Sequence, residues 1–345
     1  MARPGDRSKR PPTMTDVARM VGVSQTTVSF VLNNVAGSNI SEETRERVLE
    51  AVKKLSYRPN AAAKVLRTSK SHTIGFITDD IATTPFAGNI IKGAQDMAWS
   101  NDKLLMIINT SNNPEIAEAA IEMMLERQVE AIMYATWRHM IVEPPPNLYE
   151  VPAVLLDCFC ADRSLPSVVP DEVGGGRTAT EVLLREGHRR VGYITLAYRP
   201  EMQAFVRLEG YKTALASYGI PFDPALVRTG TSTAVGGYSE TLELMKLPDP
   251  PTAIFCANDR TAMGAYDALK ELGLSIPRDV AVIGFDNQEI ISAFLRPGLS
   301  TLALSHYQMG QWAVEYLLSH RGTQEISEPP EQKTIECPVV MRESV

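Results

Sequence analysis

Residues 14–34 read MTDVARMVGVSQTTVSFVLNN, and their pattern of apolar and polar residues indicates the structure of the N-terminal end of the chain. Thr15 is a suitable helix N-cap, and the apolar residues that follow it recur on one helical face. Gly22 would end this helix, because glycine tolerates a left-handed backbone. Ser24 would cap a second helix, whose apolar residues, beginning with Val28, return to the same core. The pattern predicts two helices joined by a tight turn.

The opposite face of the second helix is polar apart from one aromatic side chain. Short hydroxyl and amide groups suit the edges of bases, and an aromatic ring suits the methyl group of thymine. We therefore expect this helix to enter the major groove of DNA, as in a helix-turn-helix domain. The expected contacts are Thr15, Ser24, Gln25, Thr26, Thr27, Ser29, Phe30 and Asn33.

A third helix is expected over residues 41–57, which read SEETRERVLEAVKKLSY. Ser41 is its expected cap, and its apolar residues recur with helical spacing. This helix would close a three-helix unit. The residues expected to face inward are Val48, Leu49, Val52 and Leu55.

Charge is distributed unevenly along the 345 residues. Residues 1–72 hold 13 basic and 6 acidic side chains, a net charge of +7. Because the whole chain carries a net charge of −7, the remaining residues together carry −14. A basic head on an acidic body suits a DNA-binding domain attached to a body with another role, because phosphate attraction is the sequence-independent part of such binding. Residues 1–12 are rich in basic residues and proline, and we expect a disordered arm there.

The composition excludes several classes of protein. No run of about 18 apolar residues occurs, and the N-terminus lacks the apolar stretch of a secretory signal, so we expect a cytoplasmic protein without membrane contact. The four cysteines show no C-x-x-C spacing and the five histidines are scattered. We therefore expect no disulfide framework, no metal site and no cofactor.

With these motifs, the chain resembles the lactose/galactose repressor (LacI) family of bacterial transcription regulators. The motifs occur in family order: TDVARMVGVSQTTVSFVLNN, SEETRERVLEAVKKLSYRPNAAAKVLR, HTIGFITDD, EGHRRVGYI, ANDRTAMGAYDALKELGLSIPRDVAVIGFDN and LSTLAL. The resemblance implies a homodimer with a helix-turn-helix domain over residues 13–58, a hinge over 59–71 and a ligand-binding and dimerisation body over 72–345. It also implies that the body has the two-lobed fold of periplasmic sugar-binding proteins. The chain would cross between the lobes near Asp171, Leu304 and Lys333.

The hinge follows Pro59, which blocks continuation of the preceding helix. Residues 60–68 favour a helix that is too short to be stable alone, so it should fold only when docked. In the resembled family, paired hinge helices enter the minor groove and a leucine wedges between bases, the position on which Leu66 falls. The alternative is a simple tether whose leucine packs on the body. The expected DNA contacts in and before this segment are Tyr57, Asn60, Ala63, Lys64 and Leu66.

From His72 onward, short apolar runs alternate with amphipathic stretches, the pattern of parallel βαβ units. One series runs from TIGFIT through KLLMIINT and AIMYAT to AVLLD, and a second runs from RVGYIT through AIFCAN to VAVIGFD. We therefore expect an α/β fold with two doubly wound lobes. Such sheets bind ligands beyond the carboxyl ends of their strands, so two facing lobes would form a hinged cleft.

Polar residues at the strand ends are the candidates for effector binding, since carboxylates and amides can each form two hydrogen bonds with sugar hydroxyls. They are Asp79, Asp80, Asp157, Asn258, Asp259 and Asp286. The resemblance places Asp157, Arg207, Asn258 and Asp286 at effector-contacting positions, with Phe86, Gln203 and His306 lining the same cleft. For Asp157, Asn258 and Asp259, capping of a turn is an equal alternative. For Phe86 and His306, core packing is an equal alternative.

Two departures from the family pattern bear on specificity. Phe30 stands where many members carry a basic or imidazole side chain that reads the operator. Pro170, Asp171 and Glu172 replace the more usual aspartate-asparagine sequence, and no aromatic residue directly follows Asp157. The operator sequence and the effector are therefore not carried over from the family.

Enzymatic activity is not expected, because the chain lacks the G-x-S-x-G elbow, the phosphate-binding loop and the H-E-x-x-H pair. The glycines at 174–176 match no dinucleotide fingerprint and are better explained by close helix packing. A solute-binding protein without a DNA role is less favoured, since it would need a secretory signal. The expected function is a sequence-specific repressor of carbohydrate-use genes, which binds a palindromic operator and responds to a small, neutral sugar. A purine corepressor is the alternative effector.

Overall fold

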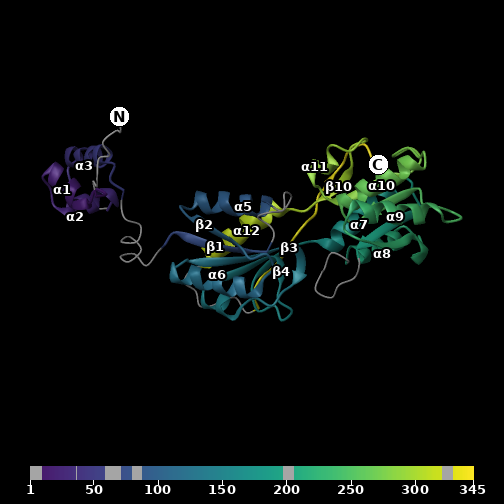
Figure 1. The fold of residues 1–345 in the computed structure, drawn as a ribbon, viewed down its shortest axis with the longest axis horizontal. Coiled ribbons are helices and arrows are strands. Elements are labelled where there is room, and N and C mark those ends of the chain that lie inside the picture. Colours follow the sequence, from purple (N-terminus) through teal and green to yellow (C-terminus); the bar gives the residue numbers. More distant parts are fainter. Residues whose placement is uncertain (1–9, 36, 59–70, 80–87, 197–205, 321–328) are drawn as a thin grey trace, which may run out of the picture. The chain divides into compact units, whose positions relative to one another are not determined.

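The computed structural model describes residues 10–35, 37–58, 71–79, 88–196, 206–320 and 329–345. The chain divides into two units, Met1–Ser71 and His72–Val345 (Figure 1). Each unit has its own hydrophobic core.

The N-terminal unit contains α1 (Met14–Val21), α2 (Gln25–Leu32) and α3 (Glu42–Leu55). The N-cap of α1 is Thr13, so the expectation that Thr15 caps this helix is wrong. The reason is a capping box between Thr13 and Asp16: the backbone N and Oγ1 of Thr13 donate to Asp16 Oδ2 over 2.9 and 2.7 Å. The other two caps are Ser24 and Ser41, as expected.

A small apolar core joins these three helices. Val17, Val28 and Val48, one from each helix, are fully buried. Gly22 has a φ of 80° and ends α1 as expected. Leu49, in contrast, was expected to face inward and is 41% exposed. Val48 and Ala51, three residues apart, take the inward positions of α3, which leaves Leu49 on the solvent side.

The body contains two six-stranded sheets. The first has the order β11-β5-β4-β3-β1-β2 and the second has the order β12-β10-β9-β8-β6-β7. All pairings in both sheets are parallel except that between β10 and β12. The strands are β1 Thr73–Thr78, β2 Leu104–Asn109, β3 Ala131–Ile141, β4 Ala153–Phe159, β5 Ser167–Pro170, β6 Val191–Leu196, β7 Val227–Gly230, β8 Ala253–Cys256, β9 Ala281–Asp286, β10 Ser300–Ala303, β11 Gln332–Ile335 and β12 Val339–Val340.

Helices cover both faces of each sheet, so the expected α/β class with two doubly wound lobes is confirmed (Figure 1). The first sheet packs between α5 (Gly88–Ser100) with α12 (His306–Ser319) and α6 (Pro114–Glu126) with η2 (Pro146–Glu150). The second packs between α7 (Glu172–Arg185) with α8 (Arg207–Ser217) and α9 (Ala234–Met245) with α10 (Asp259–Glu271). The short helices η4 (Pro224–Leu226) and α11 (Glu289–Ser292) lie in connections.

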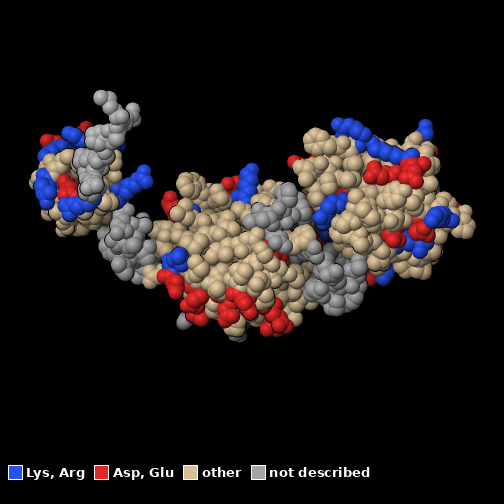
Figure 2. All heavy atoms as spheres, in the orientation of Figure 1, with Lys and Arg blue, Asp and Glu red and all other residues tan. Residues whose placement is uncertain are grey.

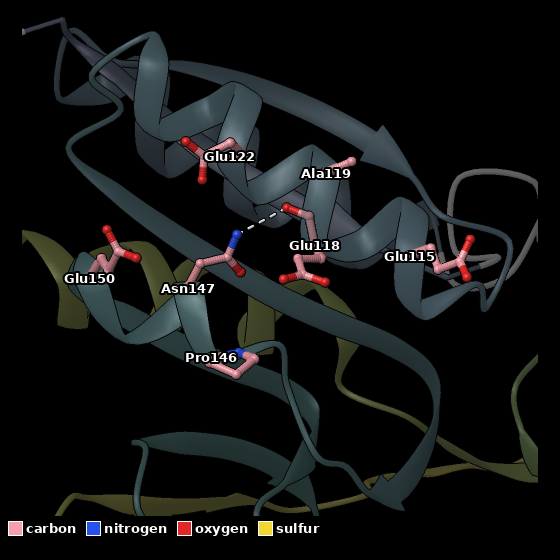
Figure 3. Close-up of a pocket in the computed structure, with 7 residues that line it drawn as sticks. All are labelled: Glu115, Glu118, Ala119, Glu122, Pro146, Asn147 and Glu150. Carbon is pink, nitrogen blue, oxygen red and sulfur yellow. Dashed lines mark hydrogen bonds between the residues drawn. The ribbon is translucent and has the colours of Figure 1, made fainter.

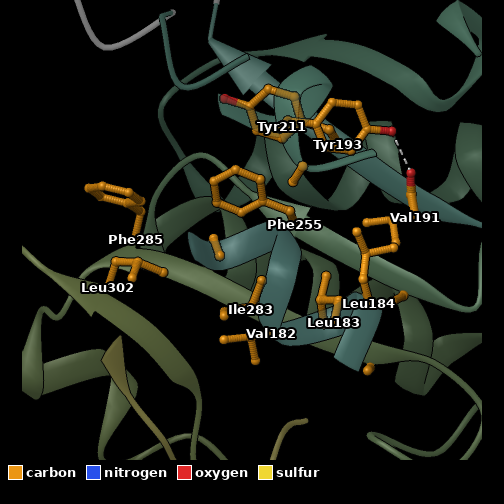
Figure 4. Packing of buried hydrophobic residues seen from close by; sticks show 14 of the residues in the cluster. Val182, Leu183, Leu184, Val191, Tyr193, Tyr211, Phe255, Ile283, Phe285 and Leu302 are labelled. Carbon is orange, nitrogen blue, oxygen red and sulfur yellow. Dashed lines mark hydrogen bonds between the residues drawn. The ribbon is translucent and has the colours of Figure 1, made fainter. Parts of the chain in front are cut away.

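An aromatic stack fills the core of the second lobe. The ring of Tyr193 lies 4.6 Å from that of Phe255 and 5.4 Å from that of Tyr211, measured between centroids (Figure 4). The Tyr211 hydroxyl donates to the carbonyl oxygen of Val191 over 2.8 Å, so this polar group is satisfied within the core. Phe285, near the end of β9, belongs to the same cluster and packs against Phe255.

The chain passes between the lobes three times. Asp171 separates β5 from α7, residues 304–305 separate β10 from α12, and residues 336–338 separate β11 from β12. The third crossing lies just beyond Lys333, which belongs to β11. Helix α12, which returns to the first lobe after the second crossing, was not expected, although its apolar residues Met309, Ala313 and Leu317 recur every four positions.

Candidate operator interface and effector site

The exposed surface of α2 carries part of the expected operator contacts. Gln25 and Thr26 are exposed, and the Phe30 side chain is 39% exposed although it lies between two buried valines. Gln25 Nε2 donates a hydrogen bond to Thr15 Oγ1, which links this face to α1. Thr15, Gln25, Thr26 and Phe30 therefore lie at the surface of the N-terminal unit.

Other expected operator contacts have structural roles in the helix ends. Ser24 Oγ accepts from the Thr27 backbone N over 3.0 Å, and Asn33 Nδ2 donates to the Ser29 carbonyl oxygen over 2.6 Å. Tyr57 packs into the core of the N-terminal unit and is 9% exposed. The expected contacts Asn60, Ala63, Lys64 and Leu66 lie outside the described residues.

Two of the expected effector carboxylates stand in unusual backbone geometry. Asp157, in β4, has a φ of 56°, and Asp286, the last residue of β9, has a φ of 101°. Non-glycine residues seldom adopt positive φ values, and such residues concentrate at binding sites because the strain re-aims a side chain. Asp157 Oδ1 is buried and has no hydrogen-bond partner among the described residues. Asp286 Oδ2, in contrast, accepts a hydrogen bond from Gln288 Nε2 over 3.0 Å.

Arg207, the first residue of α8, organises the polar cluster around them. It is 3% exposed and donates through Nη2 to Glu172 Oε1 over 3.1 Å and through Nε to Glu172 Oε2. Its Nη1 donates to the carbonyl oxygen of Ala257, and its guanidinium lies 3.6 Å from the centroid of the Phe285 ring. Asp286 Oδ1 lies 3.8 Å from Nη2. The fold thus brings Arg207 and Asp286 together as expected.

Burial shifts the pKa values in this cluster. It raises the pKa of the Asp286 carboxyl to about 6, although the Arg207 charge opposes this shift. It also raises the pKa of Asp157 well above the ordinary value, and the negative charge of Glu172 adds to that shift. For Arg207, burial works against the charged form, but Glu172 and Asp286 outweigh it and raise the guanidinium pKa.

Glu172 and His139 belong to the cluster and were not expected there. His139 lies on β3, which continues beyond the expected residues 131–136 as far as Ile141, with a register shift against β4. Its Nδ1 is 3.9 Å from Glu172 Oε1, and burial lowers the pKa of its imidazole to about 4. Both ring nitrogens lack a hydrogen-bond partner among the described residues. The departure from the family pattern at Glu172 was visible in the sequence, whereas nothing there indicated His139.

Asn258 and Asp259 hold loops at the same edge of the second sheet. Asn258 caps α10 by accepting from the Thr261 backbone N over 2.8 Å, and its Nδ2 donates to Ser232 Oγ over 2.6 Å. Asp259 accepts from Thr301 Oγ1 over 2.6 Å and from the Gln288 backbone N over 2.5 Å. Asn258 therefore caps a helix, and Asp259 ties the loop after β9 to β10.

Two further candidates for the effector site, His306 and Asp79, are buried in the structure. His306 is the first residue of α12, immediately after the second crossing, and is 4% exposed. Asp79 is buried at the end of β1, where its carboxylate accepts from the Trp137 backbone N over 3.1 and 3.2 Å. Phe86 and Gln203, with Asp80, lie outside the described residues.

Two hollows lie on the first lobe, beside α6. One, of about 590 Å³, is bordered by Asp79, Tyr134 and Thr136 at the strand ends. The other, of about 650 Å³, is acidic, and Asn147 in it donates to the Glu118 carbonyl oxygen over 3.0 Å (Figure 3). Its glutamates are Glu115, Glu118, Glu122 and Glu150. Acidic side chains gather on this lobe in Figure 2, and such a surface repels phosphate rather than attracting it.

Within the described ranges, no helix is long and apolar enough to cross a bilayer. No group of three or more His, Cys, Asp or Glu side chains in those ranges could hold a metal ion. The four cysteines are buried and free.

Comparisons with known proteins agree with this architecture. Residues 13–60 match the model of bacterial regulatory proteins of the lacI family, and residues 180–345 match a periplasmic binding protein-like domain. The ribose operon repressor of Haemophilus influenzae is 31% identical over 96% of this chain and 98% of its own. The transcriptional regulator GalS of Salmonella typhimurium is 36% identical over 89% of each chain.

Among solved structures, the lac repressor dimer bound to operator and an anti-inducer superimposes with a TM-score of 0.78. It is 27% identical and covers 97% of this chain and 99% of its own. The ribose operon repressor and the lac repressor structure thus match nearly the whole length of the chain, and the two family models match its N-terminal unit and the larger part of its body. The protein belongs to the lacI family of bacterial regulatory proteins.

Proposed function

We propose that the protein is a dimeric transcriptional repressor of carbohydrate-use genes whose affinity for its operator is set by a small sugar. The buried polar cluster around Arg207 carries this proposal, because it joins groups from both lobes of the body. Asp157 and His139 come from the first sheet, whereas Arg207 and Asp286 come from the second lobe. A ligand bound there would contact both lobes at once. The ribose operon repressor and GalS, as similar proteins, support a sugar as that ligand.

The proposed mechanism is thermodynamic linkage. Asp157 and Arg207 are 2% and 3% exposed, so a ligand can contact them only if the two lobes move apart. A sugar that binds one arrangement of the lobes better than another shifts the population toward it. The same shift would move the segment that precedes β1 and change operator affinity. A coupling free energy of about 1–3 kcal/mol corresponds to about 5- to 150-fold in affinity.

The DNA contacts are part of the proposal. The exposed residues Thr15, Gln25, Thr26 and Phe30 would read base edges in the major groove. The hinge residues Asn60, Ala63, Lys64 and Leu66, which lie outside the described residues, would enter the minor groove, with Leu66 as the wedge. The protein would act by binding rather than by catalysis, and it would act in the cytoplasm, where the operator DNA is.

Selection of DNA from a random library by the full-length protein tests this proposal. The expected product is a palindromic sequence with two half-sites, because a symmetric dimer reads a symmetric site. A thermal-shift screen against neutral sugars and purine bases then identifies the effector, since a ligand at 100 times its Kd adds about 2.7 kcal/mol. Stabilisation by a purine and not by any sugar would support a purine corepressor. A failure to select any DNA sequence would contradict the proposal that the protein is a sequence-specific repressor.

A further inference from the structure

Strand β3 bulges where it passes Asp157. The register between β3 and β4 shifts between Ala135 and Met140, so residues 136–139 of β3 stand opposite Asp157 alone. Irregularities of this kind re-aim side chains and are frequent next to functional sites. The last residue of the bulge, His139, is thereby placed beside Asp157 on the neighbouring strand.

Hydrogen bonds hold the bulge in this conformation. Thr136 Oγ1 donates to the carbonyl oxygen of Asp157 over 3.1 Å. The backbone N of Trp137 donates to the carboxylate of Asp79 over 3.1 and 3.2 Å. These bonds tie residues 136–139 to β4 and to the end of β1. The position of His139 is therefore built into the first lobe.

The imidazole of His139 is buried without a hydrogen-bond partner. Its side chain is 9% exposed, and its ring packs edge-on against Phe159 with 5.6 Å between the centroids. Neither ring nitrogen has a partner among the described residues. Glu172 Oε1 lies 3.9 Å from Nδ1, which is too far for a hydrogen bond. Buried polar groups are nearly always hydrogen-bonded, so two unpaired nitrogens on one ring indicate that a ligand completes the site.

The chemistry of these unpaired atoms indicates which ligand group fits. At pH 7 the imidazole is neutral, because burial lowers the pKa of His139 to about 4, so one nitrogen donates and the other accepts. Asp157 Oδ1, on the adjacent strand, is also buried and unpaired among the described residues. A hydroxyl group both donates and accepts, whereas a carboxylate or phosphate oxygen only accepts. The atoms beside the bulge therefore fit a ligand that carries hydroxyl groups.

We infer that His139 is an effector-binding residue of the first lobe, which hydrogen-bonds a hydroxyl of the effector beside Asp157 and rejects the deoxy sugar that lacks this hydroxyl. The inference rests on the sugar-binding function proposed above. It adds to the site a residue that neither the sequence pattern nor the family resemblance indicated. Without sugar, the unpaired imidazole destabilises the protein, because its nitrogens have lost water and gained no partner.

Calorimetry on the full-length protein with deoxy sugars tests the inference. The probes are ribose, galactose and glucose, or another sugar that the thermal-shift screen identifies, each with its monodeoxy analogues. One analogue of the sugar that binds should bind wild type at least about tenfold more weakly than its parent, because it leaves the imidazole unpaired. His139→Leu should bind that parent and that analogue equally within about threefold, because the contact is already absent.

His188→Leu is the matched control. His188 lies in the second lobe between α7 and β6, and its Nδ1 is hydrogen-bonded to Thr252 Oγ1 over 2.9 Å. This variant should bind every sugar as wild type does. His139→Gln keeps a donor and an acceptor, so it should retain more affinity for the parent sugar than His139→Leu does. Operator binding by each variant reports whether it folds.

Thermal unfolding without sugar separates a binding role from a structural one. His139→Leu removes two buried polar atoms that have no partner, so its thermal midpoint should equal or exceed that of wild type. His188→Leu removes a nitrogen that has a partner, so its midpoint should fall. A midpoint of His139→Leu below that of His188→Leu would show that the imidazole supports the fold.

Nitrogen NMR of the histidine side chains reports the contact in the wild-type protein. The spectrum of His139→Gln identifies the signals of His139 among the five histidines. At pH 7 these signals should be those of a neutral imidazole, and a saturating sugar should shift them and leave the His188 signals unchanged.

The outcomes separate the inference from the function on which it rests. A sugar that binds and changes operator affinity without shifting the His139 signals would overturn the inference and leave the proposed function intact. Equal losses for every deoxy analogue in wild type and His139→Leu would also overturn it, as would a charged imidazole at pH 7. If His139→Leu does not fold, His139→Gln and the NMR spectra decide. If no sugar binds or alters operator affinity, the proposed function fails and the inference falls with it.

Discussion

Phe30 is an apolar side chain on a surface that is otherwise polar. Its neighbours Val28 and Val31 are buried, so its 39% exposure does not reflect a poorly packed core. We predict that Phe30→Ala weakens binding to the selected operator by about tenfold, because contact with a thymine methyl is lost. Binding to unrelated DNA and its salt dependence should not change, since they rest on basic side chains.

Leu49→Ala provides the control for this prediction. Leu49 is 41% exposed on α3, so the two substitutions remove similar amounts of apolar surface from different helices. Fluorescence anisotropy with the selected operator measures both variants. Equal losses of affinity in Phe30→Ala and Leu49→Ala would show that Phe30 has no specific contact with a base.

The raised pKa of Asp286 predicts that the stability of the protein falls as the pH rises. Its pKa in the folded protein is about 6, above the ordinary value of 3.8, so the folded state holds the proton more tightly. Stability should therefore fall as the pH rises from about 4 to about 6, by up to roughly 3 kcal/mol from this group. Asp286→Asn should remove that loss, and its thermal midpoint should rise relative to wild type across this window.

Asp279 serves as a control, because its pKa is shifted in the opposite direction. Hydrogen bonds from the Ser275 backbone and from Arg278 lower the pKa of its carboxyl. Asp279→Asn should therefore have a lower thermal midpoint than wild type above pH 3.8, where the stabilisation by the ionised carboxylate is fully present, and the difference should vanish as the pH falls through the folded pKa. If Asp286→Asn and Asp279→Asn changed the thermal midpoint in the same direction between pH 4 and 7, the burial of Asp286 would not govern its titration.

Single residues also mark the limit of what the sequence could predict. Asp157 and Asp286 were identifiable because they follow apolar strands, and parallel strands end at a common edge. His139 was not, because its approach to Glu172 depends on the extension of β3 beyond the expected strand. The capping role of Thr13 could have been predicted from the sequence, because Thr13 and Asp16 have the spacing of a capping box.

The close packing of α7 against α8 predicts how a substitution between these helices changes stability and sugar binding. Gly176→Ala places a Cβ against the backbone of Arg207, which cannot move aside as a flexible side chain would. We predict a loss of about 1–3 kcal/mol in stability, together with weaker sugar binding, because α8 carries Arg207. Thermal unfolding and calorimetry measure the two effects.

Gly88→Ala is the matched substitution in an open position. Among the residues that the structure describes, a Cβ on Gly88 would meet nothing within 4 Å. Gly88 begins α5, so alanine there should leave stability unchanged or raise it slightly. A Gly176→Ala variant as stable as Gly88→Ala would mean that α7 and α8 can separate freely, and Glu172 would then not be held on Arg207.

The helices and strands were predictable to different degrees. The strands of the two βαβ series were evident as apolar runs, because a parallel sheet buries both faces of its strands. Helix α12 and the short strands β5, β10, β11 and β12 were not assigned. Short strands such as β12, of two residues, carry too few side chains for a periodic pattern, and their position depends on the crossings between lobes.

At the scale of the whole molecule, the two units have separate cores, which predicts separable functions. A protein consisting of residues 72–345 should bind the sugar with the affinity of the full-length protein. It should have no affinity for the operator, because the positive charge and the exposed face of α2 are lost. Operator binding by this truncated body in a gel-shift assay would contradict the assignment of DNA contacts to the N-terminal unit.

A sugar bound at the Arg207 cluster should control operator affinity, and a titration of operator DNA can show this. Operator affinity of the full-length protein is measured by fluorescence anisotropy with and without the saturating sugar, for wild type and for Asp157→Ala. The sugar should change the wild-type affinity by about 5- to 150-fold. Asp157→Ala should bind the operator normally without sugar and respond only at much higher sugar concentration. An operator affinity that no sugar changes, or an Asp157→Ala response identical to wild type, would contradict the claim.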